Sequence, residues 1–278
     1  MQNLNNQNSK DQKIIQNPIE DKEGSNIIIA QPWEDLDKHK VNAVRHTSNK
    51  YLKFINTEVF SETSKYFLRH GVYTHAPEGT SEHKEFWDEQ EKRCIDGYTV
   101  AGVRVTGEHY AYLNFGRILA TVDDGKRQRK VDTFPKFLDM DYYWYHELEQ
   151  AEQNGQGMIV VKARRKGFSY KNAFGMALEY NFFSFSISIL AAYEKTFWAN
   201  TMEMAKNMIN FFNENTDWSK GVLHDRQDAV KSGYVEKDPI SGVNIQKGYK
   251  SEIVALSFKD SPQKSVGRTA ERMLFEEA

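Results

Sequence analysis

Residues 158–169 read MIVVKARRKGFS, an apolar run that passes into a basic loop. The four apolar residues 158–161 predict a short buried strand, and the pattern from Ser169 to about Phe182 predicts a helix. A strand that ends in a tight loop before a helix presents unpaired N–H groups and the positive end of the helix dipole. The segment therefore predicts a phosphate-binding loop, and the simpler alternative is a solvated basic turn in which Gly167 serves only the backbone geometry.

The loop matches the phosphate-loop pattern G-x-x-x-x-G-K-[ST] only in part. Gly167 and Ser169 are in register, but Phe168 occupies the usual lysine position and Lys162 the usual first glycine position. A long lysine side chain can reach the phosphates from the opposite end of the same loop, so Lys162 becomes the candidate. The loop carries three further cations, which are Arg164, Arg165 and Lys166.

Strand-like and helix-like patterns alternate after the loop. A buried strand is predicted at Ile187–Ala192, and a helix follows in which apolar residues recur at steps of three and four. Residues 213–250 look irregular, and further strands are predicted at residues 253–256 and 273–275. This alternation predicts an α/β fold with a mostly parallel sheet that helices cover on both faces.

The last predicted strand ends in two adjacent carboxylates, Glu276 and Glu277. In phosphate-loop ATPases, one acid at such a strand end holds Mg²⁺ and a second can polarise the attacking water. Glu276 would take the metal role and Glu277 the catalytic-base role. The alternative for two acids at a strand end is a solvated terminus.

The chain divides into three parts by composition. Residues 1–30 are rich in Asn and Gln and predict a disordered arm. Residues 31–153 predict a helical and hairpin region, with a hairpin at residues 97–105, a helix capped by Thr106 and another helix with Pro135 in its first turn. The turn signal at Asn154-Gly155 separates this region from residues 154–278, the predicted core.

Composition excludes several classes of protein. The 278 residues carry 37 Lys+Arg against 39 Asp+Glu, so net charge predicts neither a strong polyanion binder nor an acidic tail protein. The 39% of hydrophobic residues supports a packed core. A single cysteine, Cys94, suits a reducing cytosol, and with no apolar run of about 18 residues we expect a soluble protein with no membrane contact. Residues 126–130 hold four cations. They either contact DNA phosphates or form a solvated loop.

Taken together, these residues resemble the large terminase subunit of tailed bacteriophages, the ATP-driven motor that packages DNA. The likeness covers roughly residues 86–278. It rests on the loop KARRKGFS, on ISILAAY and SEIVALSF, on the final stretch SPQKSVGRTAERMLFEEA, and upstream on CIDGYTVAGVRVTGEHYAYLNFGRI. The resemblance implies a P-loop NTPase core of the ASCE type, incomplete at its C-terminus, preceded by an α+β extension.

The resemblance also implies roles for residues and cofactors. ATP and Mg²⁺ would be bound, with Glu276 and Ser169 on the metal, Glu277 activating water and Arg164 neutralising the phosphates or the transition state. Two departures stand out: Phe168 lies where many members have Lys, and Glu276 where many have Asp. The implied nucleotide-binding set is Lys162, Arg165, Lys166, Gly167, Phe168 and Ser169.

The implied partners are double-stranded DNA, the portal protein and the small terminase subunit, with a homo-oligomeric ring in the full motor. The implied location is the host bacterial cytoplasm, transiently at the procapsid portal. Terminases continue beyond the acidic pair into a nuclease domain, so we expect a fragment that alone hydrolyses ATP poorly or not at all. The alternatives are another nucleic-acid-stimulated ATPase of helicase type and a nucleotide-independent capsid-assembly module.

Overall fold

The computed structural model describes residues 56–123, 125, 127–163, 166–259, 263 and 269–276. It also describes two short strands, β1 (Ile19–Glu20) and β2 (Asn26–Ile27), which pair antiparallel. The rest of the predicted disordered arm lies outside the described residues, as do Lys126, Arg164, Arg165 and Glu277.

The first half of the described chain is built from helices and two hairpins. The predicted hairpin is confirmed as β3 and β4, and the side chain of Thr106 accepts a hydrogen bond from the His109 N–H at 3.3 Å, so it caps the next helix as expected. The placement of Pro135 in a helix is wrong, because residues 134–138 form no helix and the helix begins at Asp139. In order, the elements are a 3₁₀ helix η3 (Thr57–Ser61), α1 (Glu62–His70), α2 (Ser81–Asp96), β3 (Tyr98–Val100), β4 (Val103–Val105), α3 (Gly107–Phe115), β5 (Ile118–Asp123), β6 (Gln128–Thr133) and α4 (Asp139–Gln153).

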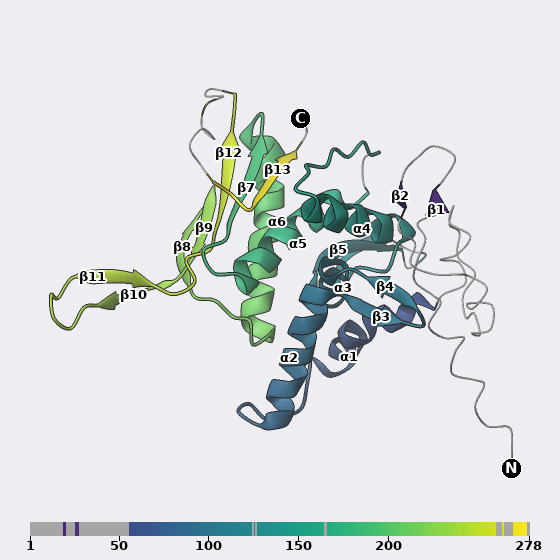
Figure 1. Cartoon of the computed structure of the whole chain (residues 1–278), viewed down its shortest axis with the longest axis horizontal. Helices are drawn as coiled ribbons and strands as arrows, with labels where there is room; N and C mark the ends of the chain where they lie inside the picture. The colour runs from purple at the N-terminus through teal and green to yellow at the C-terminus, as the bar shows by residue number, and fades with distance from the viewer. Residues whose placement is uncertain are drawn as a thin grey trace, which may run out of the picture.

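The second half contains a five-stranded sheet with the order β13-β7-β12-β9-β8 (Figure 1). The predicted strands are confirmed as β7 (Ile187–Ala192), β12 (Glu252–Ser257) and β13 (Arg272–Glu276), and β7 pairs in parallel with both of the others. Strands β9 (Ala229–Ser232) and β8 (Val222–Arg226) extend the sheet in antiparallel fashion. The sheet is therefore mixed rather than mostly parallel.

Helices α5 (Phe168–Phe182) and α6 (Lys195–Asn215) pack on one face of this sheet. The predicted apolar positions of α6, among them Met202 and Phe212, are buried in the larger core. The expectation of helices on both faces is not met in the described residues. The smaller cluster on the other face is made of strand and loop residues only, which are Ile187, Ile189, Ala191, Ala229, Val254, Leu256, Phe258 and Ala270.

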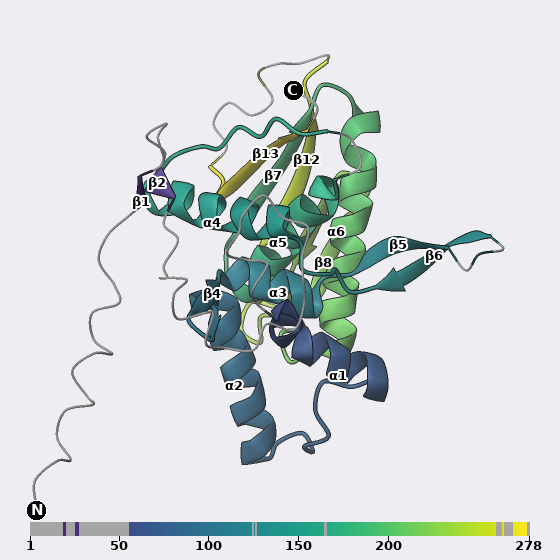
Figure 2. The same cartoon turned by 90° about the vertical axis from the view of Figure 1, so that its right-hand side faces the viewer.

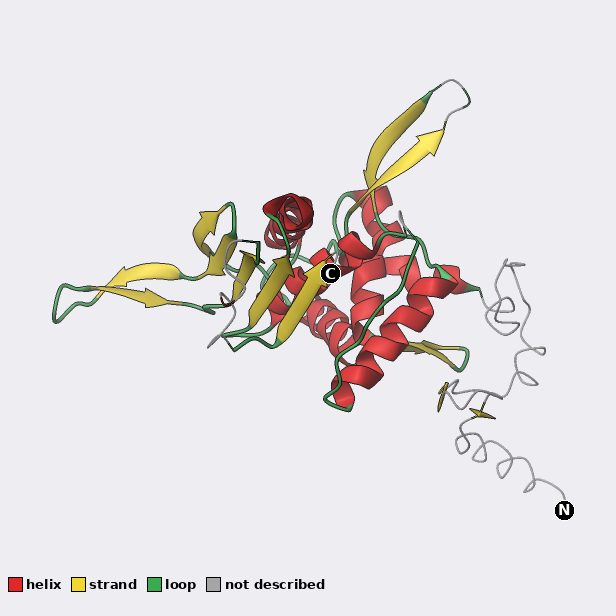
Figure 3. Cartoon of the chain, turned by 90° about the horizontal axis from the view of Figure 1, so that it is seen from above, coloured by secondary structure: helices red, strands yellow, loops and turns green. Residues whose placement is uncertain are grey.

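The segment 213–250, predicted to be irregular, holds four strands. Besides β8 and β9, it forms the antiparallel pair β10 (Tyr234–Lys237) and β11 (Asn244–Lys247). This hairpin projects from the sheet in Figures 1 and 3, and all of its strand residues are exposed. A strand that is exposed on both faces needs no alternation of apolar and polar residues, so the sequences of β10 and β11 do not indicate strands. A second hairpin, β5–β6, projects from another side of the molecule and carries the basic residues Arg129 and Lys130 (Figure 2).

The prediction of a strand at residues 158–161 is wrong, because the structure has no strand there. These residues belong to no helix and no sheet, and Ile159 and Val161 are 94% and 98% exposed. An apolar run becomes a strand only when a neighbouring strand accepts its backbone hydrogen bonds. Among the described residues, no strand pairs with the segment.

One hydrophobic core runs through both halves of the chain. The ring of Trp218 lies 5.0 Å from that of Trp87 in α2 and 4.8 Å from that of Phe115 in α3. Phe115 also stacks on Phe212 of α6 at 6.3 Å. The boundary expected near residue 154 therefore does not separate two cores.

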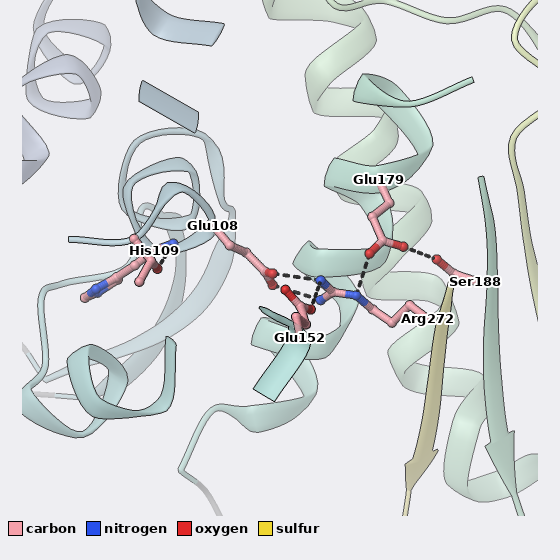
Figure 4. Close-up of polar contacts among 7 residues, drawn as sticks. Glu108, His109, Glu152, Glu179, Ser188 and Arg272 are labelled. Carbon is pink, nitrogen blue, oxygen red and sulfur yellow. Dashed lines mark hydrogen bonds and ion pairs between the residues drawn. The ribbon is translucent and has the colours of Figure 1, made fainter. Parts of the chain in front are cut away.

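A largely buried ion-pair network, in which only Glu152 is more than half exposed, joins the N-terminal helices to β13. Arg272 donates to Glu108 of α3 at 2.8 and 3.0 Å, to Glu179 of α5 at 2.7 Å and to Glu152 of α4 at 3.2 Å. Figure 4 shows its guanidinium between Glu108 and Glu179, and Ser188 donates to Glu179 at 2.8 Å. Three elements of the chain thus converge on the first residue of β13.

Candidate functional site

The basic loop ends where α5 begins. Gly167 precedes the helix with φ +75°, a left-handed conformation that favours glycine. It offers no capping side chain, and the first turn of α5 contains no acidic residue. The first N–H groups of the helix are therefore not satisfied by a cap, as a phosphate-binding turn requires.

Glu276 ends β13 and faces this turn. The hydroxyl of Thr201, on α6, donates to Glu276 Oε2 at 2.6 Å. The side chains of Ser169 and Asn172, both on α5, also lie within hydrogen-bonding reach of the carboxylate. The site is thus built from the first turn of α5, the first half of α6 and the tip of β13.

The environment of Glu276 changes its acidity in two directions. Burial, the largest effect, raises its pKa above the usual value. Hydrogen bonds from Thr201, Ser169 and Asn172 lower the pKa, and so does the positive charge of Lys162. Burial prevails, so the carboxyl holds its proton more tightly than a solvated glutamic acid. Binding a cation here would offset that cost of burying the charge.

Of the residues predicted from sequence, Ser169 lies within hydrogen-bonding reach of Glu276, and Lys162 is near enough for its charge to lower the pKa of that carboxyl. Lys162, Lys166 and Gly167 are exposed, as residues that meet a solvent-borne ligand must be. Arg164, Arg165 and Glu277 lie outside the described residues, so their predicted roles stay predictions.

Phe168 does not stand in for a phosphate-binding lysine. Its ring is buried and makes an edge contact with Trp144 of α4 at 4.9 Å. The ammonium of Lys171 lies 4.0 Å from the ring centroid, and that of Lys162 lies 5.7 Å from it. Phe168 therefore fixes the end of the loop against α4, and two cations lie beside its ring.

Asn172 and Thr201 belong to the site but were not identified from the sequence. Asn172 follows Ser169 by three residues, so helical periodicity places both on one face of α5 and could have indicated it. Thr201 lies 75 residues before Glu276 and carries no local signal. Only the packing of α6 against the sheet brings it to the carboxylate.

The donors around Glu276 suit a hard divalent cation. Among the described residues, no group of three histidine, cysteine or acidic side chains could hold a metal ion. The oxygens available are one carboxylate, two hydroxyls and the amide of Asn172. Mg²⁺ is commonly bound through only one or two carboxylates together with substrate phosphates and waters, so this set fits Mg²⁺ with a phosphate ligand.

A separate pocket opens at the start of α2 and contains none of the predicted site residues. Its polar wall includes His83, whose Nδ1 lies 3.3 Å from Asp217 and whose Nε2 accepts from Trp87 at 3.3 Å. Both nitrogens of His83 are therefore used within the fold, and this pocket is a weaker candidate for chemistry.

No known family model matches the chain, and no curated protein matches it significantly. Within the part of the chain that the structure describes, no helix has the length and apolar character needed to cross a membrane.

Proposed function

We propose that this chain is an ATP-binding part of a DNA-packaging motor of the phage terminase type. The observation that carries the proposal is that Ser169, at the end of the basic loop, lies within hydrogen-bonding reach of Glu276, and that the charge of Lys162, at the start of the loop, acts on the same carboxylate. A hydroxyl at a helix N-terminus, a lysine and a strand-end carboxylate are the groups that phosphoryl transfer to water requires.

Each group has a distinct task in this proposal. Lys162 binds the outer phosphates of ATP. The uncapped N–H groups at the start of α5 bind further phosphate oxygens. Ser169 and Glu276 hold Mg²⁺, which when bound neutralises charge on the phosphate oxygens. Glu277 orients the attacking water, and Arg164 offsets charge that develops in the transition state.

The motor function adds partners to this site. Double-stranded DNA is the translocated substrate, and the portal protein and small terminase subunit are the assembly partners, with a homo-oligomeric ring as the working form. The support for this finer assignment is the resemblance in residues 86–278 together with the phosphate-type site.

Nucleotide affinity tests the proposal directly. Binding of a fluorescent ATP analogue to the full chain should need Mg²⁺, and Lys162→Ala should weaken it about 10- to 100-fold, because a hydrogen bond to a charged group contributes roughly 1.5–3 kcal/mol. Glu276→Gln should reduce the dependence on Mg²⁺. The matched control is Lys237→Ala, an exposed lysine on the projecting β10 strand, which should leave affinity unchanged.

The outcomes separate the alternatives. Wild-type chain that binds no nucleotide would favour the capsid-assembly module. If Lys162→Ala leaves the affinity for the ATP analogue unchanged, the basic loop is not the phosphate-binding loop. If ATP is bound and the chain separates DNA strands, the helicase-like alternative gains over the packaging motor.

A further inference from the structure

A buried ion pair lies directly behind the loop. Lys171, on α5, pairs with Asp141 in the first turn of α4, and their side chains are 1% and 5% exposed. The proposed chemistry uses neither residue. Burial lowers the pKa of Lys171 and raises that of Asp141, and the attraction between them opposes both shifts.

Lys171 contacts the end of the loop in two ways. Its ammonium lies 4.0 Å from the centroid of the Phe168 ring and 3.5 Å from the backbone oxygen of Lys166. Phe168 also meets Trp144, one helical turn after Asp141 on α4. The residues on either side of Gly167 are thus both in contact with an ion pair that α4 completes.

A buried ion pair is weak evidence for stability as such, because apolar residues of similar size often serve as well. A charge in that position does supply directional contacts that an apolar side chain lacks, here to an aromatic face and a carbonyl oxygen. The contacts fall on Lys166 and Phe168, the two neighbours of the left-handed Gly167. The ion pair therefore contacts the backbone and the side chain on either side of Gly167, the residue at which the loop turns into α5.

We propose that Lys171 and Asp141 form a positioning pair that fixes the loop, so that Ser169 stays within reach of Glu276 and the charge of Lys162 stays near that carboxylate. Through this pair, α4 sets the affinity for the triphosphate, a conclusion that rests on the proposed function. Lys171 is a positioning residue rather than a phosphate ligand, because its ammonium is buried and already bound to Asp141.

The test uses the full chain and hydrogen exchange, which needs no nucleotide. Single substitutions leave a buried unpaired charge and can prevent folding, so the main variant is the double Asp141→Ala/Lys171→Met, which removes both charges. We expect a melting temperature within a few degrees of wild type. Loop exchange is measured at the amides of residues 171–174, the first that the hydrogen bonds of α5 protect, beginning with the Lys171 N–H that donates to the Gly167 oxygen at 3.2 Å, and it should be at least about tenfold faster. Binding of the fluorescent ATP analogue should weaken about tenfold.

Two controls make the result specific. The double variant Asp88→Ala/Lys84→Met removes an exposed pair of the same residue types, 2.6 Å apart on α2, and should change neither loop exchange nor affinity. Lys171→Arg keeps a cation beside Phe168 and should retain most of the loop protection.

The readouts separate this inference from the proposed function. Loop exchange in the main double variant that equals wild type would overturn the positioning pair, even if the wild type binds ATP. Faster loop exchange in a chain that binds no ATP would support the positioning of the loop but remove its link to nucleotide affinity, along with the proposed function.

Discussion

Substitution of Arg272 by Met should be among the most damaging single changes in this chain. The guanidinium makes hydrogen bonds to Glu108 and Glu179, whose side chains are largely buried, and Met leaves both carboxylates without their cation. Removing one partner of a buried ion pair typically costs about 3–5 kcal/mol. For a chain of this size, each kcal/mol lowers the melting temperature by about 2–4 °C, so the expected drop is roughly 6–20 °C.

The loss should depend on pH in a defined direction. Burial already raises the pKa of Glu179, and Arg272 opposes that rise. Without Arg272 the pKa in the folded chain rises further, while the unfolded chain keeps the usual value near 4.5. A carboxyl with a raised folded pKa stabilises the fold below the unfolded value and loses that contribution as pH increases. The deficit of the variant should therefore be largest near pH 8 and shrink as the pH falls towards 5.

Urea unfolding at several pH values, followed by tryptophan fluorescence, measures this deficit. The matched control is Arg226→Met on β8, since Arg226 is 68% exposed and 3.7 Å from Asp228. That change should cost less than about 0.5 kcal/mol at every pH. A deficit for Arg272→Met below about 1 kcal/mol at pH 7.5, or one that is equal at pH 5 and pH 8, would refute the reasoning.

Two further predictions concern buried positions. Gly175→Ala should destabilise the fold by about 1–3 kcal/mol in the same assay, because the added methyl group would clash with the Arg272 guanidinium, which its hydrogen bonds to Glu108 and Glu179 hold in place. Cys94, the single thiol, is buried, and burial raises its pKa well above the usual value. Labelling of the native chain by a thiol reagent should thus be at least about a hundredfold slower than in denaturant, and fast labelling of folded protein would contradict the buried position.

Apolar runs and apolar periodicity were sufficient to predict the elements that pack against the core. Strands β7 and β12 are buried on both faces, so their sequences are nearly continuous apolar runs, whereas α6 buries one face and repeats apolar residues at steps of three and four. Strands β8, β10 and β11 carry no such signal, because nearly all of their side chains are exposed, and β9 is buried but only four residues long. The run at 158–161 shows the converse, since apolar residues alone do not create a strand.

The residues of the candidate site were also predictable only in part. Lys162 and Ser169 were predicted from a local pattern, and Glu276 from the end of a predicted strand. Their approach depends on β13 lying parallel to β7, beside the start of α5. Thr201 and Asp141 are 75 and 30 residues distant from the partners they bind, and no short-range pattern relates such positions.

The N-terminal helices are a structural part of the candidate site. Strand β13 carries Arg272 at its first residue and Glu276 at its last, so the ion pairs that Glu108 and Glu152 make with Arg272 fix one end of the strand whose other end faces the loop. Helix α4 acts at both places, because it supplies Glu152 to Arg272 and Asp141 to the pair behind the loop. A division of the chain at residue 154 would leave Arg272 without two of its three carboxylates and Lys171 without its partner. The loop and the acidic strand are therefore both held by contacts with α3 and α4, which lie before them in the sequence.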